Sequence, residues 1–249
     1  MSQATRLPVF RSLNALNSTI AACGKCPRLV AYRAEVARVK RRAFREQTYW
    51  GRPVPGWGDP RAWLWVVGLA PAAHGGNRTG RVFTGDRSGD FLYAALHRAG
   101  LANQSSSVSI DDGLQLSGVY ISAAVRCAPP DNKPLPSEYD NCRPYLLADL
   151  HLLKDARVIF ALGKIAFDSA LRVLADSGAS IPSPRPAFGH ARAYTAGDYT
   201  LVSSYHPSQR NTQTGLLTPA MMDHALALAK DAYEQRHIVN HRGTEDTEM

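Results

Sequence analysis

The segment of residues 63–93 constrains the fold of this chain more than any other. It opens with a short continuous apolar run, 63–67, which is typical of a strand covered on both faces. A polar, glycine-rich loop follows over 74–86, and apolar residues then recur at helical spacing from a start that Ser88 or Asp90 would cap. A buried strand, a long polar loop and a helix in this order predict one unit of a parallel sheet.

Three more apolar runs have the same character and predict further strands, at 119–125, 156–162 and 200–204. A helical pattern follows each of them, and crossovers of this length join parallel neighbours. We therefore expect a three-layer α/β sandwich with a central, mainly parallel four-stranded sheet. A hairpin turn at Gly197 and Asp198 should precede the last strand. Ligands bind beyond the carboxyl ends of such strands, where the loops gather on one rim.

At 249 residues the chain is long enough to bury one sizeable core. We expect a single domain over residues 1–235. Within it, the apolar spacing predicts an amphipathic helix in 1–20 and a basic helix over 29–46, and Pro219 begins the last helix. The polar tail, 236–249, is expected to be disordered.

The formal charge of +8 and the pI near 9.5 favour a polyanionic partner such as nucleic acid. The basic residues of 29–46 form either a solvated helix face or a surface that contacts phosphates. No apolar run approaches the ~20 residues of a membrane span, and the N-terminus lacks the apolar core of a secretory signal. We therefore expect a cytoplasmic protein.

The cysteines occur as two pairs: Cys23 and Cys26 form a CxxC, and Cys127 and Cys142 follow much later. Four cysteines in a long chain without secretory features argue against a disulfide framework and for a metal site. Their spacing fits either zinc or an iron–sulfur cluster and does not separate the two. The alternative is four unrelated core cysteines. A bound metal would tie the N-terminal segment to the loop after the second strand, which is a structural role.

Three further motifs carry a family resemblance: GLAPAAHGGNRTGRVFTGD at 68–86, VRCAPPDNKP at 125–134 and HPSQRN at 206–211. Together with the cysteine pairs, and in this order, they resemble the family 5, or type b, uracil-DNA glycosylases over nearly the whole chain. The resemblance implies the uracil-DNA glycosylase fold and excision of uracil and some other deaminated or damaged bases from DNA, as in base-excision repair. It also implies a 4Fe-4S cluster, with zinc as the less favoured alternative, on Cys23, Cys26, Cys127 and Cys142.

Many members of the wider superfamily carry an Asp, Asn or Glu just after the first strand to handle the attacking water. Residues 69–72 offer none here, as is typical of this subfamily, and the resemblance assigns the role to Asp86. Breaking an N-glycosidic bond develops positive charge on the deoxyribose and negative charge on the departing base. Asp86 suits the positive charge that develops on the deoxyribose, because a carboxylate can act on water or stabilise the cationic sugar.

The base would be held by three other side chains. His206 would donate a hydrogen bond to the base O2, and Phe83 would stack on the base. Asn132 would offer a donor and an acceptor to the edge of an extruded uracil. Each of these four side chains also has an ordinary structural alternative. Asp86 could cap a helix, and Phe83 could be a core side chain. Asn132 could shape a turn between prolines, and His206 could make an interior hydrogen bond.

His74 and Asn77 are further candidates for contacting the substrate. The loop 208–215 would enter the duplex and hold it open, with Arg210 and Asn211 at the DNA. The expected partner is double-stranded DNA that contains uracil or a damaged base, or single-stranded DNA, and the expected state is a monomer.

Ala123 occupies the position, four residues before the third cysteine, where the wider superfamily often has a base-reading Asn. The absence of that Asn could accompany a looser pocket that accepts purine lesions as well as uracil. Two other functions compete. A zinc-stabilised nucleic-acid-binding module without catalysis would also suit the charge and the CxxC. A nucleotide phosphate enzyme is disfavoured, because the loop lacks the GxxxxGK[ST] spacing and no acidic magnesium cluster is evident.

Overall fold

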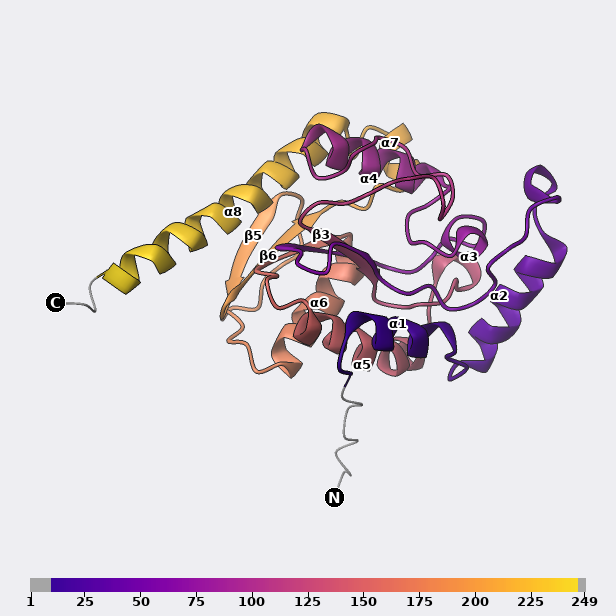
Figure 1. Ribbon diagram of the computed structural model, residues 1–249, viewed down its shortest axis with the longest axis horizontal. Coiled ribbons are helices and arrows are strands. Elements are labelled where there is room, and N and C mark those ends of the chain that lie inside the picture. The colour runs from indigo at the N-terminus through magenta and orange to yellow at the C-terminus, as the bar shows by residue number, and fades with distance from the viewer. Residues whose placement is uncertain (1–9, 246–249) are drawn as a thin grey trace, which may run out of the picture.

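A six-stranded sheet forms the centre of the molecule (Figure 1). The computed structural model describes residues 10–245, with side chains through residue 236. The strand order is β1-β3-β2-β4-β6-β5. The strands are β1 (Trp57–Gly58), β2 (Leu64–Gly68), β3 (Val119–Ala123), β4 (Val158–Leu162), β5 (Arg192–Ala196) and β6 (Tyr199–Ser204).

The four predicted strands are β2, β3, β4 and β6, and each pairs with its neighbour in parallel, so the predicted α/β class is confirmed. The hairpin between β5 and β6 is confirmed as well. Two short antiparallel pairings at the edges complete the sheet, and β1 lies in a Pro/Gly/Trp segment that carries no strand pattern.

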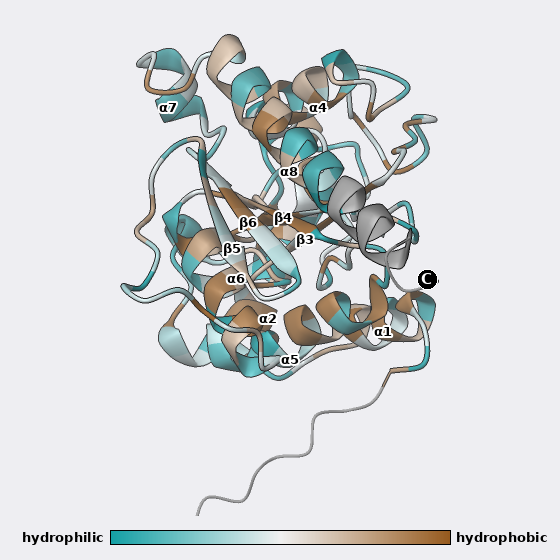
Figure 2. Ribbon diagram, turned by 90° about the vertical axis from the view of Figure 1, so that its left-hand side faces the viewer, coloured by the Kyte–Doolittle hydropathy of each residue, from teal (hydrophilic) through white to brown (hydrophobic). Residues whose placement is uncertain are grey.

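The helices are α1 (Leu13–Ala21), α2 (Pro27–Val39), α3 (Gly76–Thr79), α4 (Arg87–Arg98), α5 (Pro136–Leu152), α6 (Lys164–Asp176), α7 (Gln209–Gln213) and α8 (Pro219–Glu245), with single 3-10 turns η1 (Arg42–Phe44) and η2 (Pro130–Asn132). Figure 2 shows α4 and α8 on one face of the sheet and α1, α5 and α6 on the other. None of the helices in residues 10–245 is long and apolar enough to cross a membrane.

The central strands read as unbroken apolar runs because both of their faces are covered. Alternate residues of β2 go to separate cores: Leu64 and Val66 pack toward α4 and α8, whereas Trp65 and Val67 pack toward α5 and α6. Every residue of β2, β3 and β4 is buried. This double coverage produces the three layers, and the parallel direction of β2, β3, β4 and β6 places the loops after them on one rim.

Two helix boundaries differ from the sequence prediction. The basic helix ends at Val39 and not at residue 46, because Lys40 adopts a positive φ of 59° that a right-handed helix cannot contain. The helix after the glycine-rich loop is capped by Asp86, two residues before the predicted Ser88 and four before Asp90.

The prediction of a disordered tail from residue 236 is wrong up to Glu245, because α8 continues that far. Extending an existing helix adds a hydrogen bond for each residue without a new nucleation step, and no proline interrupts residues 236–245. Residues 246–249 and the first nine residues, including Leu7 of the predicted amphipathic segment, lie outside the described residues. The single domain over 1–235 stays a prediction.

Candidate functional site

Phe83 and His206 lie over the ends of two neighbouring parallel strands. A Cβ added at Gly68, the last residue of β2, would come within 2.8 Å of the Phe83 ring. One added at Gly163, directly after β4, would come within 3.1 Å of the His206 Cβ. The two ring centroids are 6.0 Å apart, at an interplanar angle of 34°. Glycine at both strand ends therefore makes the space in which these two side chains meet.

Phe83 is held in a conformation that is unfavourable for an aromatic residue. Its φ is 54°, in the left-handed region, which costs about 1–3 kcal/mol for a residue with a bulky side chain. Its ring is partly buried and packs against the core beneath α4, so the core alternative also holds in part. Strain of this kind persists only where the surrounding structure enforces it, and it concentrates at functional sites.

Asp86 caps α4, which is the structural alternative that the sequence left open. Its Oδ1 accepts a hydrogen bond from the Gly89 N–H at 3.0 Å. Its Oδ2 faces Gly75, where an added Cβ would overlap this oxygen. Burial raises the pKa of Asp86, while the N–H groups of Gly89 and Ser88 act in the opposite direction. Capping engages Oδ1 and does not exclude a second role for the other oxygen.

His206 is partly buried, and burial lowers its pKa to about 4. The imidazole is therefore neutral near pH 7 and can donate one N–H. Asn211 fixes the turn that follows, because its Nδ2 donates to the His206 carbonyl at 2.8 Å. Arg210, in the same short helix α7, is exposed. The loop after β6 thus presents a neutral imidazole and the exposed guanidinium of Arg210, and Asn211 holds its shape.

The two other candidates in the glycine-rich loop differ from each other. His74 is partly buried, and its Nδ1 lies 3.0 Å from the Tyr49 hydroxyl. Burial lowers the pKa of His74, with smaller contributions from Arg41 and Arg78. Asn77 is fully buried, and its amide donates to the Arg33 carbonyl of α2 at 3.3 Å. Asn77 thus braces the loop against α2, and its contact with a substrate stays a prediction.

Arg78 has a role in this loop that the sequence did not reveal. Its guanidinium donates to the His74 carbonyl at 2.8 Å and to the Gly85 carbonyl at 2.9 Å, so it joins the two ends of the loop. It also donates to Gln47 at 2.6 Å and is almost fully buried. The available signal was an arginine among glycines, since a guanidinium has five N–H donors for the carbonyls that such a loop leaves unpaired.

Asn132 is exposed in η2, and its φ of 55° follows a φ of 52° at Asp131. Asp and Asn tolerate this left-handed region better than other non-glycine residues, so the turn between prolines accounts for both. Within residues 10–236 the Asn132 side chain has no hydrogen-bond partner, and nothing joins it to Phe83, Asp86 or His206. Its reading of a base stays a prediction.

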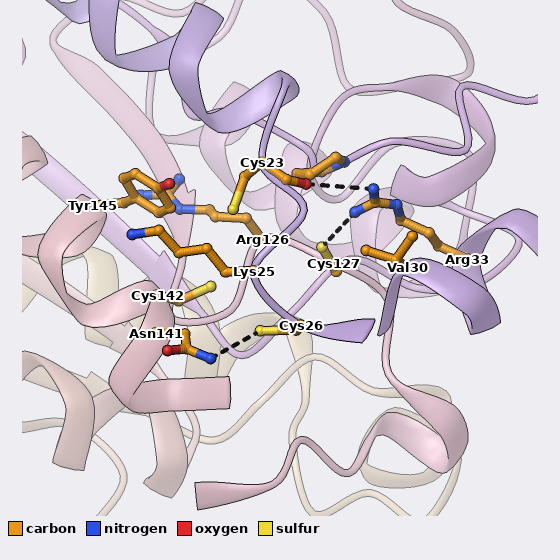
Figure 3. Close-up of a pocket in the computed structure, with 11 residues that line it drawn as sticks. Cys23, Lys25, Cys26, Val30, Arg33, Arg126, Cys127, Asn141, Cys142 and Tyr145 are labelled. Carbon is orange, nitrogen blue, oxygen red and sulfur yellow. Dashed lines mark hydrogen bonds between the residues drawn. The ribbon is translucent and has the colours of Figure 1, made fainter. Parts of the chain in front are cut away.

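All four cysteines line one cavity between α1, α2, α5 and the loop after β3. Figure 3 shows their sulfur atoms turned toward a common space. Arg33 donates to the Cys127 Sγ at 3.1 Å, and Asn141 donates to the Cys26 Sγ at 3.4 Å. Burial raises the pKa of Cys127 to about 11.

Lys25 and Arg126 line the same cavity, so positive charge surrounds the sulfurs. Arg126 is buried and paired with Asp149, yet its Nε and Nη1 find no partner in the described part of the chain. Across residues 10–236, whose side chains the structure describes, no group of three His, Cys, Asp or Glu side chains that could hold a metal ion is found. The predicted gathering of the four thiols is present around this one cavity.

Comparison with known proteins points to one family. Residues 55–230 match the family model of the uracil DNA glycosylase superfamily. A type-5 uracil-DNA glycosylase of Mycobacterium tuberculosis is 55% identical over 88% of this chain and 81% of its own length. One from Thermus thermophilus is 50% identical over 85% and 94%. A type-4 uracil-DNA glycosylase of Pyrobaculum aerophilum is 31% identical over 65% and 66%.

Proposed function

This chain belongs to the type-5 enzymes of the uracil-DNA glycosylase superfamily, and from that premise we propose how its residues release a base. It is a hydrolase of DNA base-excision repair that cleaves the N-glycosidic bond of uracil in DNA. The relatives are named as enzymes and align over most of their length, which favours the glycosylase over a non-catalytic binding module.

Asp86 is the residue proposed to act at the sugar. A carboxylate there stabilises the positive charge that develops on the deoxyribose or orients the attacking water. Its cap bond supports this role, because the Gly89 N–H fixes the carboxyl group and favours its ionised form. Its burial keeps bulk water from screening that charge.

His206 and Phe83 are proposed to hold the departing base. The neutral imidazole donates its N–H to the base O2, where negative charge develops, and Phe83 stacks on the ring of the extruded base. The observation that carries the proposal is the convergence at the strand ends: Phe83 lies against His206, and Asp86 follows Phe83 by three residues.

Small residues at the ends of β2 and β3 support a substrate range wider than uracil. Gly68 pairs in register with Ala123, so two small residues lie side by side where the wider superfamily often has an Asn. We propose that the site, without that Asn, accepts deaminated purines as well as uracil. The test is a panel of duplexes carrying uracil, hypoxanthine or ethenocytosine, beside an undamaged duplex, scored for alkali-labile sites. Release of uracil alone would contradict the wider range and leave the glycosylase assignment intact.

The cysteine cavity is proposed to hold a 4Fe-4S cluster on Cys23, Cys26, Cys127 and Cys142. Iron–sulfur clusters are bound by four thiolates and are stabilised by hydrogen bonds to sulfur, which Arg33 and Asn141 provide. A single zinc ion on the same four sulfurs, each about 2.3 Å from the metal, is the alternative occupant of the cavity. The cluster would join the N-terminal segment to the loop after β3 and to α5, and supplies no step of base release.

Replacing Cys127 with alanine is expected to remove the cluster before it alters the chemistry of the site. One ligand is lost, and the segment that the cluster ties down loosens. We expect loss of iron, loss of absorbance near ~400 nm and lower solubility. Asn141→Ala is the matched control, because it removes a hydrogen bond to sulfur and no ligand, and it should retain iron. A stable, fully active and iron-free Cys127→Ala protein would refute the assignment.

A second prediction concerns the basic turn after α2. Arg41, Arg42 and Arg45 are exposed there, and Arg41 is near enough to His74 to lower its pKa. We propose that this turn contacts DNA phosphates beside the site. Changing all three to glutamine should reduce the slope of log K against log salt by about 2–3, since each phosphate contact contributes about 0.9. Arg38→Gln is the control, because Arg38 already pairs with Glu35 at 2.6 Å. An unchanged slope in the triple variant would place the DNA elsewhere.

The proposal also includes four further properties of the protein. Its main partner is double-stranded DNA, Arg210 contacts a phosphate of that DNA, and the protein is a monomer in the cytoplasm.

A further inference from the structure

Residues 102–118 resemble a surface connection in the sequence, yet they are bonded to the loop that carries Phe83 and Asp86. The segment contains three consecutive serines, and only the third is buried: Ser105 and Ser106 are exposed, whereas Ser107 is 0% exposed. A serine enclosed in this way needs partners for its hydroxyl. Those partners lie in the glycine-rich loop of residues 74–86, which carries Phe83 and Asp86.

Ser107 makes three hydrogen bonds to residues 81–85. Its Oγ accepts from the Arg81 Nη2 at 2.8 Å and lies 2.7 Å from the Thr84 Oγ1. Its carbonyl accepts from the Gly85 N–H at 2.8 Å. Thr84 directly follows Phe83, and Gly85 directly precedes Asp86. One serine therefore fixes the backbone between the two proposed active-site residues.

Arg81 and Asp112 anchor this contact. They form a buried ion pair at 2.7 Å, with side chains 4% and 5% exposed. Arg81 also donates to the Thr84 Oγ1 at 2.9 Å. Asp112 accepts from the backbone N–H groups of Val108 and Leu114 at 2.8 and 3.1 Å, so it folds the segment around itself. Both partners of the pair are hydrogen-bonded, which is the condition under which a buried pair gives a defined geometry.

We propose that residues 102–118 are a positioning element for base release, in which Ser107 acts through Thr84 and Gly85 on Phe83 and Asp86. The inference rests on the proposed function of Asp86. The left-handed backbone of Phe83 is what such an element must maintain, because an isolated loop would relax from it. Ser107 is a positioning residue in this account and touches neither base nor sugar.

The test is Ser107→Ala, which removes the hydroxyl and keeps the carbonyl that binds Gly85. Single-turnover release of uracil from a duplex should slow by about 10- to 100-fold, the scale expected for a small misplacement of a reacting group, while the dissociation constant for DNA stays within about twofold. Ser106→Ala is the matched control in the same run of serines and should behave as the unaltered protein. Normal release by Ser107→Ala would overturn the proposal.

A double variant separates positioning from general loss of structure. Because Ser107 positions Asp86 as well as Phe83, adding Ser107→Ala to Asp86→Asn should slow release by a smaller factor than Ser107→Ala does alone. An equal additional loss in that background would overturn the positioning role. If Ser107→Ala does not fold, Thr84→Val removes the same hydroxyl contact from the other side and should give the same result. Slow release by Asp86→Asn with normal release by Ser107→Ala refutes this inference alone, whereas normal release by Asp86→Asn refutes the proposed function too.

Discussion

Asp86→Asn is expected to slow uracil release by about 10²- to 10⁴-fold, the range for loss of a positioned acid–base group, with DNA affinity nearly unchanged. Asparagine is as good a helix cap as aspartate, so the bond to the Gly89 N–H and the fold of α4 should survive. The substitution therefore separates the two roles of Asp86, because it removes the charge and keeps the cap. Single-turnover assays and equilibrium DNA binding measure the two effects.

Asp90→Asn is the matched control. Asp90 is an exposed acidic residue in the first turn of the same helix, and its loss should leave release unchanged. Near-normal turnover by Asp86→Asn would remove Asp86 from the mechanism and leave it as a cap.

The pH dependence of release follows from the same residue. Asp86 acts when ionised, and burial raises its pKa, so release should fall as the pH drops through a value above that of an ordinary carboxyl group. His206 contributes no loss until about pH 4, because its pKa is depressed to that value. Asp86→Asn should abolish the acid limb. An acid limb that persists in the variant would show that another group controls it.

His206→Phe is expected to slow uracil release by about 10²- to 10³-fold, the cost of removing one hydrogen bond to a developing anion. Phenylalanine keeps an aromatic ring over Gly163 and removes the N–H, so the packing against Phe83 is largely retained. The exposed His224 of α8 offers the control His224→Phe.

The choice of lesion tests the contact of His206 with O2. Hypoxanthine has no O2, so His206→Phe should slow the release of hypoxanthine by a smaller factor than the release of uracil. Equal losses on both bases would mean that His206 supports the pocket and does not contact O2.

Local pattern accounts for the part of this molecule that the sequence could predict. The parallel strands are continuous apolar runs because both faces are covered, and burial on both faces is visible in the sequence itself. The gathering of the four cysteines was also predictable, since a CxxC and a later cysteine pair in a chain of this kind favour a metal site. Asp86, Phe83 and His206 could be placed on one rim because they follow parallel strands.

Long-range partners account for what the sequence could not predict. The amide of Asn77, in a polar loop, donates to a carbonyl of α2 that lies 44 residues away in the chain. Ser107 and Asp112 looked like parts of an irregular connection, and their partner Arg81 precedes them by 26 and 31 residues. No local periodicity records such pairs. The prediction for residues 236–245 differs from the structure for another reason. Their polar composition indicates disorder, whereas the helix α8 continues through them.

The most direct test is the structure of the Asp86→Asn protein bound to a duplex that contains uracil. Our proposal predicts an extruded uracil stacked on Phe83, with a His206 ring nitrogen about 3 Å from O2. It also predicts the residue 86 side chain at the deoxyribose, beside the glycosidic bond. A uracil bound away from the ends of β2 and β4, with neither Phe83 nor His206 in contact with it, would contradict the account.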